Sequence, residues 1–159
     1  PEASSEASLF LAKAYYNVKD TTNCKPIFEK FVSESKNIFG AESQYYLAMM
    51  LKDKGVYQSS IDSALGLIKG FAAEKYWVSK AFLLIGDNYV LMGEDFQANA
   101  MYESIVTHTS YQDVKEEAQQ KWDALIAAKI QLDSLEVVPD TLEIGGEEDL
   151  NNEIDETNE

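Results

Sequence analysis

The sequence predicts an all-α protein, built as an α-solenoid of three helical hairpins with a capping helix at the C-terminal side. Three segments fall into register when the chain is shifted by 36 or 38 residues: 8–20, 44–56 and 82–94. Each carries a small residue after a large aliphatic one, and these are Ala12, Ala48 and Gly86. The chain has only three prolines and no alternating strand pattern over 1–135. A repeat of this length is typical of stacked helical hairpins that contact only their neighbours.

Helix signals place two helices in each repeat. The first helix is expected over about 5–18, 41–54 and 78–92, and the second over about 23–36, 57–69 and 95–108. Pro26 falls in the first turn of its helix, where its missing N–H costs nothing, with Thr22 or Asn23 as the cap. Gly55 and Gly93 stand where a left-handed residue ends the first helix. The repeats therefore span about 5–40, 41–78 and 79–110.

Apolar residues of the second helices explain why the hairpins close. They follow a spacing of four and then three: Cys24, Phe28 and Phe31; Ser60, Ala64 and Leu67; Ala98, Tyr102 and Ile105. This spacing puts each set on one helical face. We expect Ala12, Ala48 and Gly86 to lie where the second helix crosses the first, because their small size permits close approach of the backbones.

Residues 111–135 are expected to form one longer capping helix. Five apolar residues share a face of it: Val114, Ala118, Trp122, Leu125 and Leu132. A repeat array needs such a cap, because its last hairpin otherwise exposes its stacking surface. We expect Trp122 to anchor this packing. The solenoid domain is therefore 1–135, followed by the segment 136–159.

Most of the net charge of −15 lies in that last segment. Residues 136–159 hold ten acids and no Lys, so the body has 18 acids against 13 Lys, and Arg is absent. We expect an acidic, disordered tail that is either solvated or carries a short apolar binding motif. The acidic, Arg-free composition argues against a nucleic-acid partner. No apolar run approaches the roughly 18 residues of a membrane helix, so we expect no membrane insertion.

Residues for catalysis are scarce in this chain. His108 is the only imidazole, and no hydrolase, zinc-binding, CxxC or phosphate-binding motif is present. Cys24 matches Ser60 and Ala98 in the other repeats, which favours a small core residue over a nucleophile. We predict that the chain is not an enzyme and uses no cofactor or metal.

The third repeat resembles a tetratricopeptide repeat. The residues at the signature spacings are Phe82, Ile85, Gly86, Tyr89, Gly93, Ala98 and Tyr102. The other two repeats are degenerate, since Gln44 and Ser8 replace the early aromatic residue and Lys19 replaces the turn glycine. Proteins of this family are mostly adaptors and assembly scaffolds, so the resemblance implies a protein or peptide partner. The carboxylate clamp of some members is not expected, because no Arg completes it.

The resemblance also implies a concave groove lined by the first helices. The candidate groove residues are Leu9, Lys13, Tyr16, Asn17, Tyr45, Met49, Lys52, Lys80, Leu83, Asp87 and Leu91. Apolar anchors flanked by Lys suit a peptide with apolar and some acidic side chains. The alternative is that this face packs against further repeats, and that the chain is only a stacking and capping segment of a longer array.

The first residue is Pro1 rather than Met. We therefore expect this chain to be the C-terminal part of a longer protein. Its composition resembles the end of long bacterial repeat proteins, which suggests the periplasm or cell envelope, although the lone Cys24 does not choose between compartments.

Overall fold

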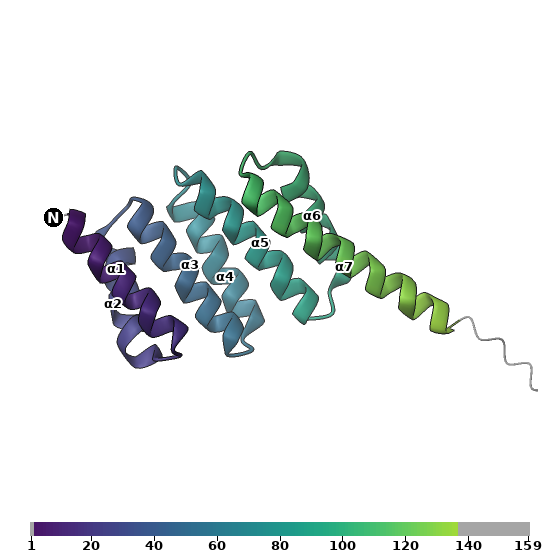
Figure 1. The fold of residues 1–159 in the computed structure, drawn as a ribbon, viewed down its shortest axis with the longest axis horizontal. Helices are drawn as coiled ribbons and strands as arrows, with labels where there is room; N and C mark the ends of the chain where they lie inside the picture. The colour runs from purple at the N-terminus through teal and green to yellow at the C-terminus, as the bar shows by residue number, and fades with distance from the viewer. Residues whose placement is uncertain (1, 137–159) are drawn as a thin grey trace, which may run out of the picture.

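The computed structural model describes residues 2–136, and every regular element in that range is an α-helix (Figure 1). The helices are α1 (Glu2–Asn17), α2 (Thr21–Glu34), α3 (Ile38–Asp53), α4 (Tyr57–Gly70), α5 (Lys75–Leu91), α6 (Asp95–His108) and α7 (Gln112–Glu136). The predicted all-α class is confirmed. All of the acidic tail predicted for 136–159 except Glu136 lies outside the described residues.

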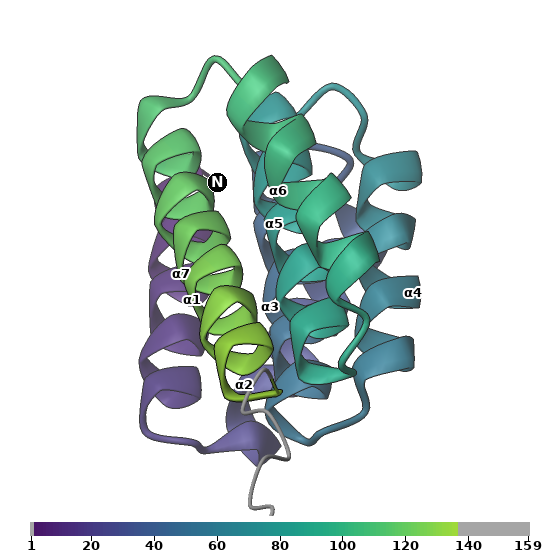
Figure 2. The same ribbon diagram turned by 90° about the vertical axis from the view of Figure 1, so that its right-hand side faces the viewer.

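The helices lie in a row in the order of the sequence, with α1 and α7 at opposite ends (Figure 1). Each helix packs on the next one along the chain, and α1, α3, α5 and α7 also contact one another in turn. Seen along the row, α4 and α7 lie on opposite sides (Figure 2). Successive first helices therefore form one layer, while α2, α4 and α6 pack between them from the other side.

Local signals explain where the helices begin. The Asp20 side chain accepts a hydrogen bond from the Asn23 backbone N–H at 3.1 Å and caps α2. The prediction of Thr22 or Asn23 as the cap was wrong, because α2 begins at Thr21. For the same reason Pro26 lies inside the helix and not in its first turn. Asn37 caps α3 in the same way through the Phe39 backbone N–H. The first helices α1, α3 and α5 all start three residues earlier than their apolar pattern suggests.

Left-handed residues follow the first helices, as predicted. Gly55 and Gly93 have φ angles of 75° and 74°. Lys19 takes the same place after α1 with φ 62°, although an L side chain rarely adopts this conformation. The degenerate first repeat therefore keeps the turn geometry without its glycine.

Small residues bring the two helices of a pair together. Ala12 and Ala48 are fully buried, and Gly86 is buried beneath the Tyr102 ring. A Cβ atom at Gly86 would lie 2.7 Å from Cε1 of Tyr102. The predicted close approach is confirmed at this position, since no side chain fits there without displacing the ring.

Helix α7 covers the end of the row with its first half. Val114 and Ala118 are fully buried, and the Trp122 indole N–H donates to Asn99 Oδ1 at 2.6 Å. Leu132, in contrast, is 61% exposed, which corrects its place on the predicted packing face. The reason is length: α7 has 25 residues and α6 has 14, so the end of α7 extends past its support (Figure 1).

Within the described range, no helix combines the length and the apolar character that crossing a membrane requires.

Candidate interaction groove

Two of the predicted groove residues belong to the core. Leu9 is 3% exposed and packs with Phe28 and Met50, while Leu83 is 2% exposed and packs with Tyr102 and Val114. Neither side chain offers surface to a partner, so neither can belong to a binding groove. They are covered because each first helix packs against a second helix and also against an adjacent first helix.

Lys13, Tyr16 and Lys80 hold neighbouring first helices together. Lys13 Nζ donates to Glu42 Oε1 at 2.8 Å, and Lys80 Nζ donates to Glu117 Oε2 at 2.7 Å. The Tyr16 hydroxyl donates to Asp53 Oδ2 at 2.7 Å. The hydrogen bond to Glu42 raises the pKa of Lys13, and burial raises the pKa of Tyr16. These polar groups are already engaged within the protein.

Tyr45 and Met49 are half-buried between α3 and α5. The Tyr45 ring lies 5.3 Å from that of Trp77, and Lys80 Nζ lies 5.9 Å from the Tyr45 ring centre. Asn17 is exposed at the last residue of α1. Tyr45 and Met49 therefore contribute more to packing between helices than to an open surface.

The remaining predicted residues, Lys52, Asp87 and Leu91, line one hollow together. We call it the α5–α7 groove, and it has a volume of about 420 Å³. Its other lining residues are Val90, Tyr102, Lys121, Ala124, Leu125 and Ala128. Residues of α3, α5, α6 and α7 meet here, so the hollow requires four helices to be packed in their places.

Asp87 and Lys121 form the floor of the groove and belong to a chain of paired charges that continues to Glu117 and Lys80 outside its lining. Asp87 accepts hydrogen bonds from the Tyr102 hydroxyl at 2.8 Å and from Lys121 Nζ, and Lys121 Nζ also lies 3.2 Å from Glu117. Burial lowers the pKa of Lys121, but Asp87 and Glu117 outweigh it and hold that pKa above its usual range. Burial likewise raises the pKa of Glu117, and its Lys80 and Lys121 partners reverse the shift and lower it. The two positive and two negative charges in this chain of charges therefore balance one another.

The walls differ from the floor in chemistry. Val90 and Leu91 are 38% and 52% exposed on α5, and Leu125 of α7 faces the same hollow. Lys52 lies at the α3 side and has no ion-pair partner among the described residues. The groove can therefore accept apolar side chains and offers one unpaired ammonium.

The predicted groove lacks its α7 wall, which consists of Lys121, Ala124, Leu125 and Ala128. The apolar pattern of 111–135 indicates a capping helix alone. A signal was present, because α7 begins 37 residues after α5, and α5 begins 37 residues after α3. Its register therefore makes α7 equivalent to the first helices α1, α3 and α5, which are the helices predicted to line the groove.

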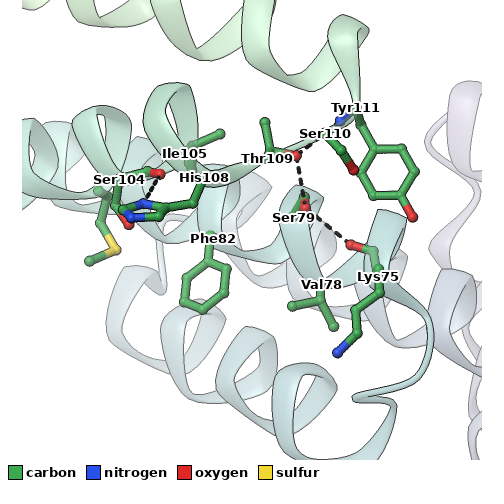
Figure 3. Close-up of a pocket in the computed structure, with 11 residues that line it drawn as sticks. Lys75, Val78, Ser79, Phe82, Ser104, Ile105, His108, Thr109, Ser110 and Tyr111 are labelled. Carbon is green, nitrogen blue, oxygen red and sulfur yellow. Dashed lines mark hydrogen bonds between the residues drawn. The ribbon is translucent and has the colours of Figure 1, made fainter.

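A second hollow lies between α5 and α6 and includes His108 (Figure 3). His108 Nδ1 lies 2.9 Å from the Ser104 carbonyl oxygen, while Ser79 donates to the Lys75 carbonyl oxygen at 3.0 Å. No described hydroxyl is hydrogen-bonded to His108, so the hollow holds no nucleophile paired with a base.

The repeat explains this second hollow. A matching hollow lies between α1 and α2, and it is lined by Ser8, Ile27 and Phe31. These residues stand 74 positions before Phe82, Met101 and Ile105, which line the hollow between α5 and α6. A feature that recurs with the repeat is a product of helix packing. We therefore base no catalytic proposal on it.

Neither a metal site nor a reactive thiol is found within the described range. It contains no group of three His, Cys, Asp or Glu residues arranged to hold a metal. Cys24 is fully buried with its Sγ 3.9 Å from Met50 Sδ, and burial raises the pKa of its thiol. A buried thiol with a raised pKa is a poor nucleophile.

Comparison of the chain with protein-family models, with curated proteins and with solved structures gives no match.

Proposed function

We propose that this chain is a short α-solenoid of the tetratricopeptide type that acts as a protein-interaction scaffold. The α5–α7 groove is its binding site. The observation that carries the proposal is the open, apolar-walled hollow of about 420 Å³ on the side formed by successive first helices. The row of paired helices and the close approach at Gly86 support the repeat type.

The chemistry of the groove favours one class of ligand. Val90, Leu91 and Leu125 offer apolar contacts, and burying an apolar side chain there is worth roughly 1.5–3 kcal/mol. Lys52 is free to pair with a carboxylate, whereas Lys121 is already paired with Asp87. The proposed ligand is a peptide segment with apolar anchors and an acidic residue placed toward α3.

Selection from a displayed library of random peptides, followed by affinity measurement on the selected sequences, tests this proposal. We expect Leu91→Glu to weaken a selected peptide by about tenfold or more, because a charge then replaces an apolar wall. Phe96→Glu is the matched control, since Phe96 is 84% exposed on α6 and does not line the groove.

Lys52→Glu tests the electrostatic part of the proposal. It should weaken acidic peptides more than their amide counterparts. Selected peptides whose affinity is the same for wild type, Leu91→Glu and Lys52→Glu would remove the α5–α7 groove as the binding site.

A second candidate function, capping the end of a repeat array, is favoured by α7. Its buried Val114 and Ala118 cover α6, while Glu116, Gln120 and Asp123 are exposed on its outer side. A polar outer face ends an array because no further hairpin packs on it. This candidate predicts that no peptide is selected by the groove at all.

A further inference from the structure

The outward side of α1 is an apolar face that no described helix covers. Ala7, Phe10, Leu11 and Ala14 lie on one side of the helix at the spacing i, i+3, i+4 and i+7, and we call them the α1 face. All four are exposed, Phe10 by 72% and Leu11 by 48%. An isolated exposed apolar residue is ordinary, but four in one stripe form a candidate interaction surface.

The other first helices show what normally covers this stripe. The same register is occupied in α3 by Ser43, Tyr46, Leu47 and Met50, and in α5 by Ala81, Leu84, Ile85 and Asn88. Ser43 and Met50 are at most 4% exposed, and the four α5 residues are at most 3% exposed. In both cases, the second helix of the preceding pair packs on the stripe, α2 on α3 and α4 on α5.

Individual contacts repeat between these two interfaces. Cys24 of α2 lies 3.9 Å from Met50 of α3, and Ser60 of α4 lies 2.9 Å from Asn88 of α5. Ser60 and Asn88 stand one repeat after Cys24 and Met50. The interface is therefore one geometry used twice with different chemistry, first a sulfur pair and then a hydrogen bond. Ala14 occupies the corresponding position on α1.

Charge pairing also links successive first helices, although the Lys stands 29 residues before its Glu in one pair and 37 residues before it in the other. Glu42 of α3 accepts from Lys13 of α1, and Glu117 of α7 accepts from Lys80 of α5. In each pair, a Glu near the start of a first helix meets a Lys of the first helix before it. Glu6 of α1 stands 36 residues before Glu42 and is exposed.

We propose that the α1 face docks another antiparallel pair of helices of the same kind, which lies before α1 in the row as α1–α2 lies before α3. Its second helix places apolar residues at i, i+4 and i+7 over Phe10 and Leu11, with a small residue against Ala14. Its first helix brings a Lys to Glu6. This inference concerns a different end of the molecule from the α5–α7 groove and does not depend on it.

The other end of the row is not a suitable occupant. The outer side of α7 carries Glu116, Gln120 and Asp123, which offer polar groups where Phe10 and Leu11 need apolar contacts. Docking of a second copy in head-to-tail order would therefore bury these polar groups without partners. A preceding pair with the side chains of α1–α2 meets the apolar and the charged requirements together.

Duplication of residues 2–37 in front of Glu2 of the full chain tests the proposal. The inserted pair then precedes α1 at the spacing at which α1–α2 precedes α3, and its Lys13 faces the original Glu6. We expect the Tm to rise by several °C. Amide hydrogen exchange over the original residues 7–14 should slow by at least tenfold, because the α1 face becomes covered.

Phe10→Glu in the original α1 supplies the specific variant. It should leave the Tm of the 159-residue chain almost unchanged, since Phe10 is 72% exposed, and should cancel the gain in Tm of the duplicated chain. Phe96→Glu is the control and should change neither protein. Lys13→Ala in the inserted copy and Glu6→Gln in the original copy should each remove the same part of the gain in Tm. The two changes combined should remove no more than either one alone.

Two results would overturn the proposal. One is unchanged exchange over residues 7–14 in a duplicated chain whose added helices are formed by circular dichroism. The other is a dimer of the 159-residue chain, measured by light scattering, that Phe10→Glu dissociates, because the α1 face would then belong to a second copy. Peptide binding in the α5–α7 groove should persist in every one of these variants, so failure here is separable from failure of the proposed scaffold function.

Discussion

Single residues decide how closely the two helices of a pair approach. Gly86 and Gly66 both lie inside helices, but their surroundings are opposite. A Cβ at Gly86 would meet the Tyr102 ring at 2.7 Å and Met101 Cβ at 3.3 Å, whereas a Cβ at Gly66 meets nothing within 4 Å. Tyr102 has little freedom to yield, because its hydroxyl is hydrogen-bonded to Asp87 and its side chain is 2% exposed. The same substitution should therefore have opposite effects at the two sites.

We expect Gly86→Ala to lower the free energy of unfolding by about 1–3 kcal/mol, because the added methyl group forces the ring and helix apart. Gly66→Ala should raise it by about 0.5–1 kcal/mol, since Ala has the better helix propensity and the site is open. Urea unfolding of both variants at one temperature measures the difference. A Gly86→Ala protein as stable as wild type would show that the contact with Tyr102 does not limit the helix approach.

At the scale of elements, α7 combines two roles along its length. Its first half buries Val114 and Ala118 over α6, and its middle supplies Leu125 and Ala128 to the α5–α7 groove. Its last turns carry Ile130, Leu132 and Leu135, which are 60%, 61% and 65% exposed. Burial thus predicts that only the earlier turns stabilise the row.

A chain that ends after Lys129 should therefore keep the Tm of the full chain to within about 3 °C, because the residues it loses whose burial the structure describes, 130–135, are all exposed. A chain that ends after Ser110 loses all of α7, exposes Tyr102 and Ile105, and should melt at least about 10 °C lower. Thermal melts followed by circular dichroism compare the two truncations. Equal melting temperatures for the two truncations would contradict the capping role of α7.

The sequence predicted the elements better than their exposed faces. Apolar spacing and turn glycines located all seven helices of the described range, because these signals are local. The predicted groove included Leu9 and Leu83, which are buried. Spacing assigns one apolar face to a helix, but α3 and α5 each pack against four other helices, so little of their surface remains free. Which part remains free depends on the register between helices, and a single repeat does not contain that information.

For the whole molecule, the order of contacts determines how the row comes apart. Among the described helices, α1 and α2 pack only on each other and on α3, whereas α5 contacts α3, α4, α6 and α7. In a row held by neighbour contacts, stability is a sum of local terms, and the ends open at lower cost than the middle. The N-terminal pair should therefore be able to detach while α3–α7 stay folded.

Leu9→Ala and Leu84→Ala distinguish an end from the middle. Leu9 is 3% exposed in the cluster around Phe28, and Leu84 is 1% exposed in the central cluster, so each change should cost about 2–5 kcal/mol locally. In native-state hydrogen exchange, Leu9→Ala should accelerate exchange in α1 and α2 and leave α5 and α6 as in wild type. Leu84→Ala should accelerate exchange in every helix, because its loss weakens the part that joins both ends. Leu65→Ala, at a site 44% exposed on α4, is the control and should accelerate none strongly. Uniform acceleration of exchange by Leu9→Ala would mean that the row unfolds as a single cooperative unit, although each described helix contacts only those one or two places away along the chain.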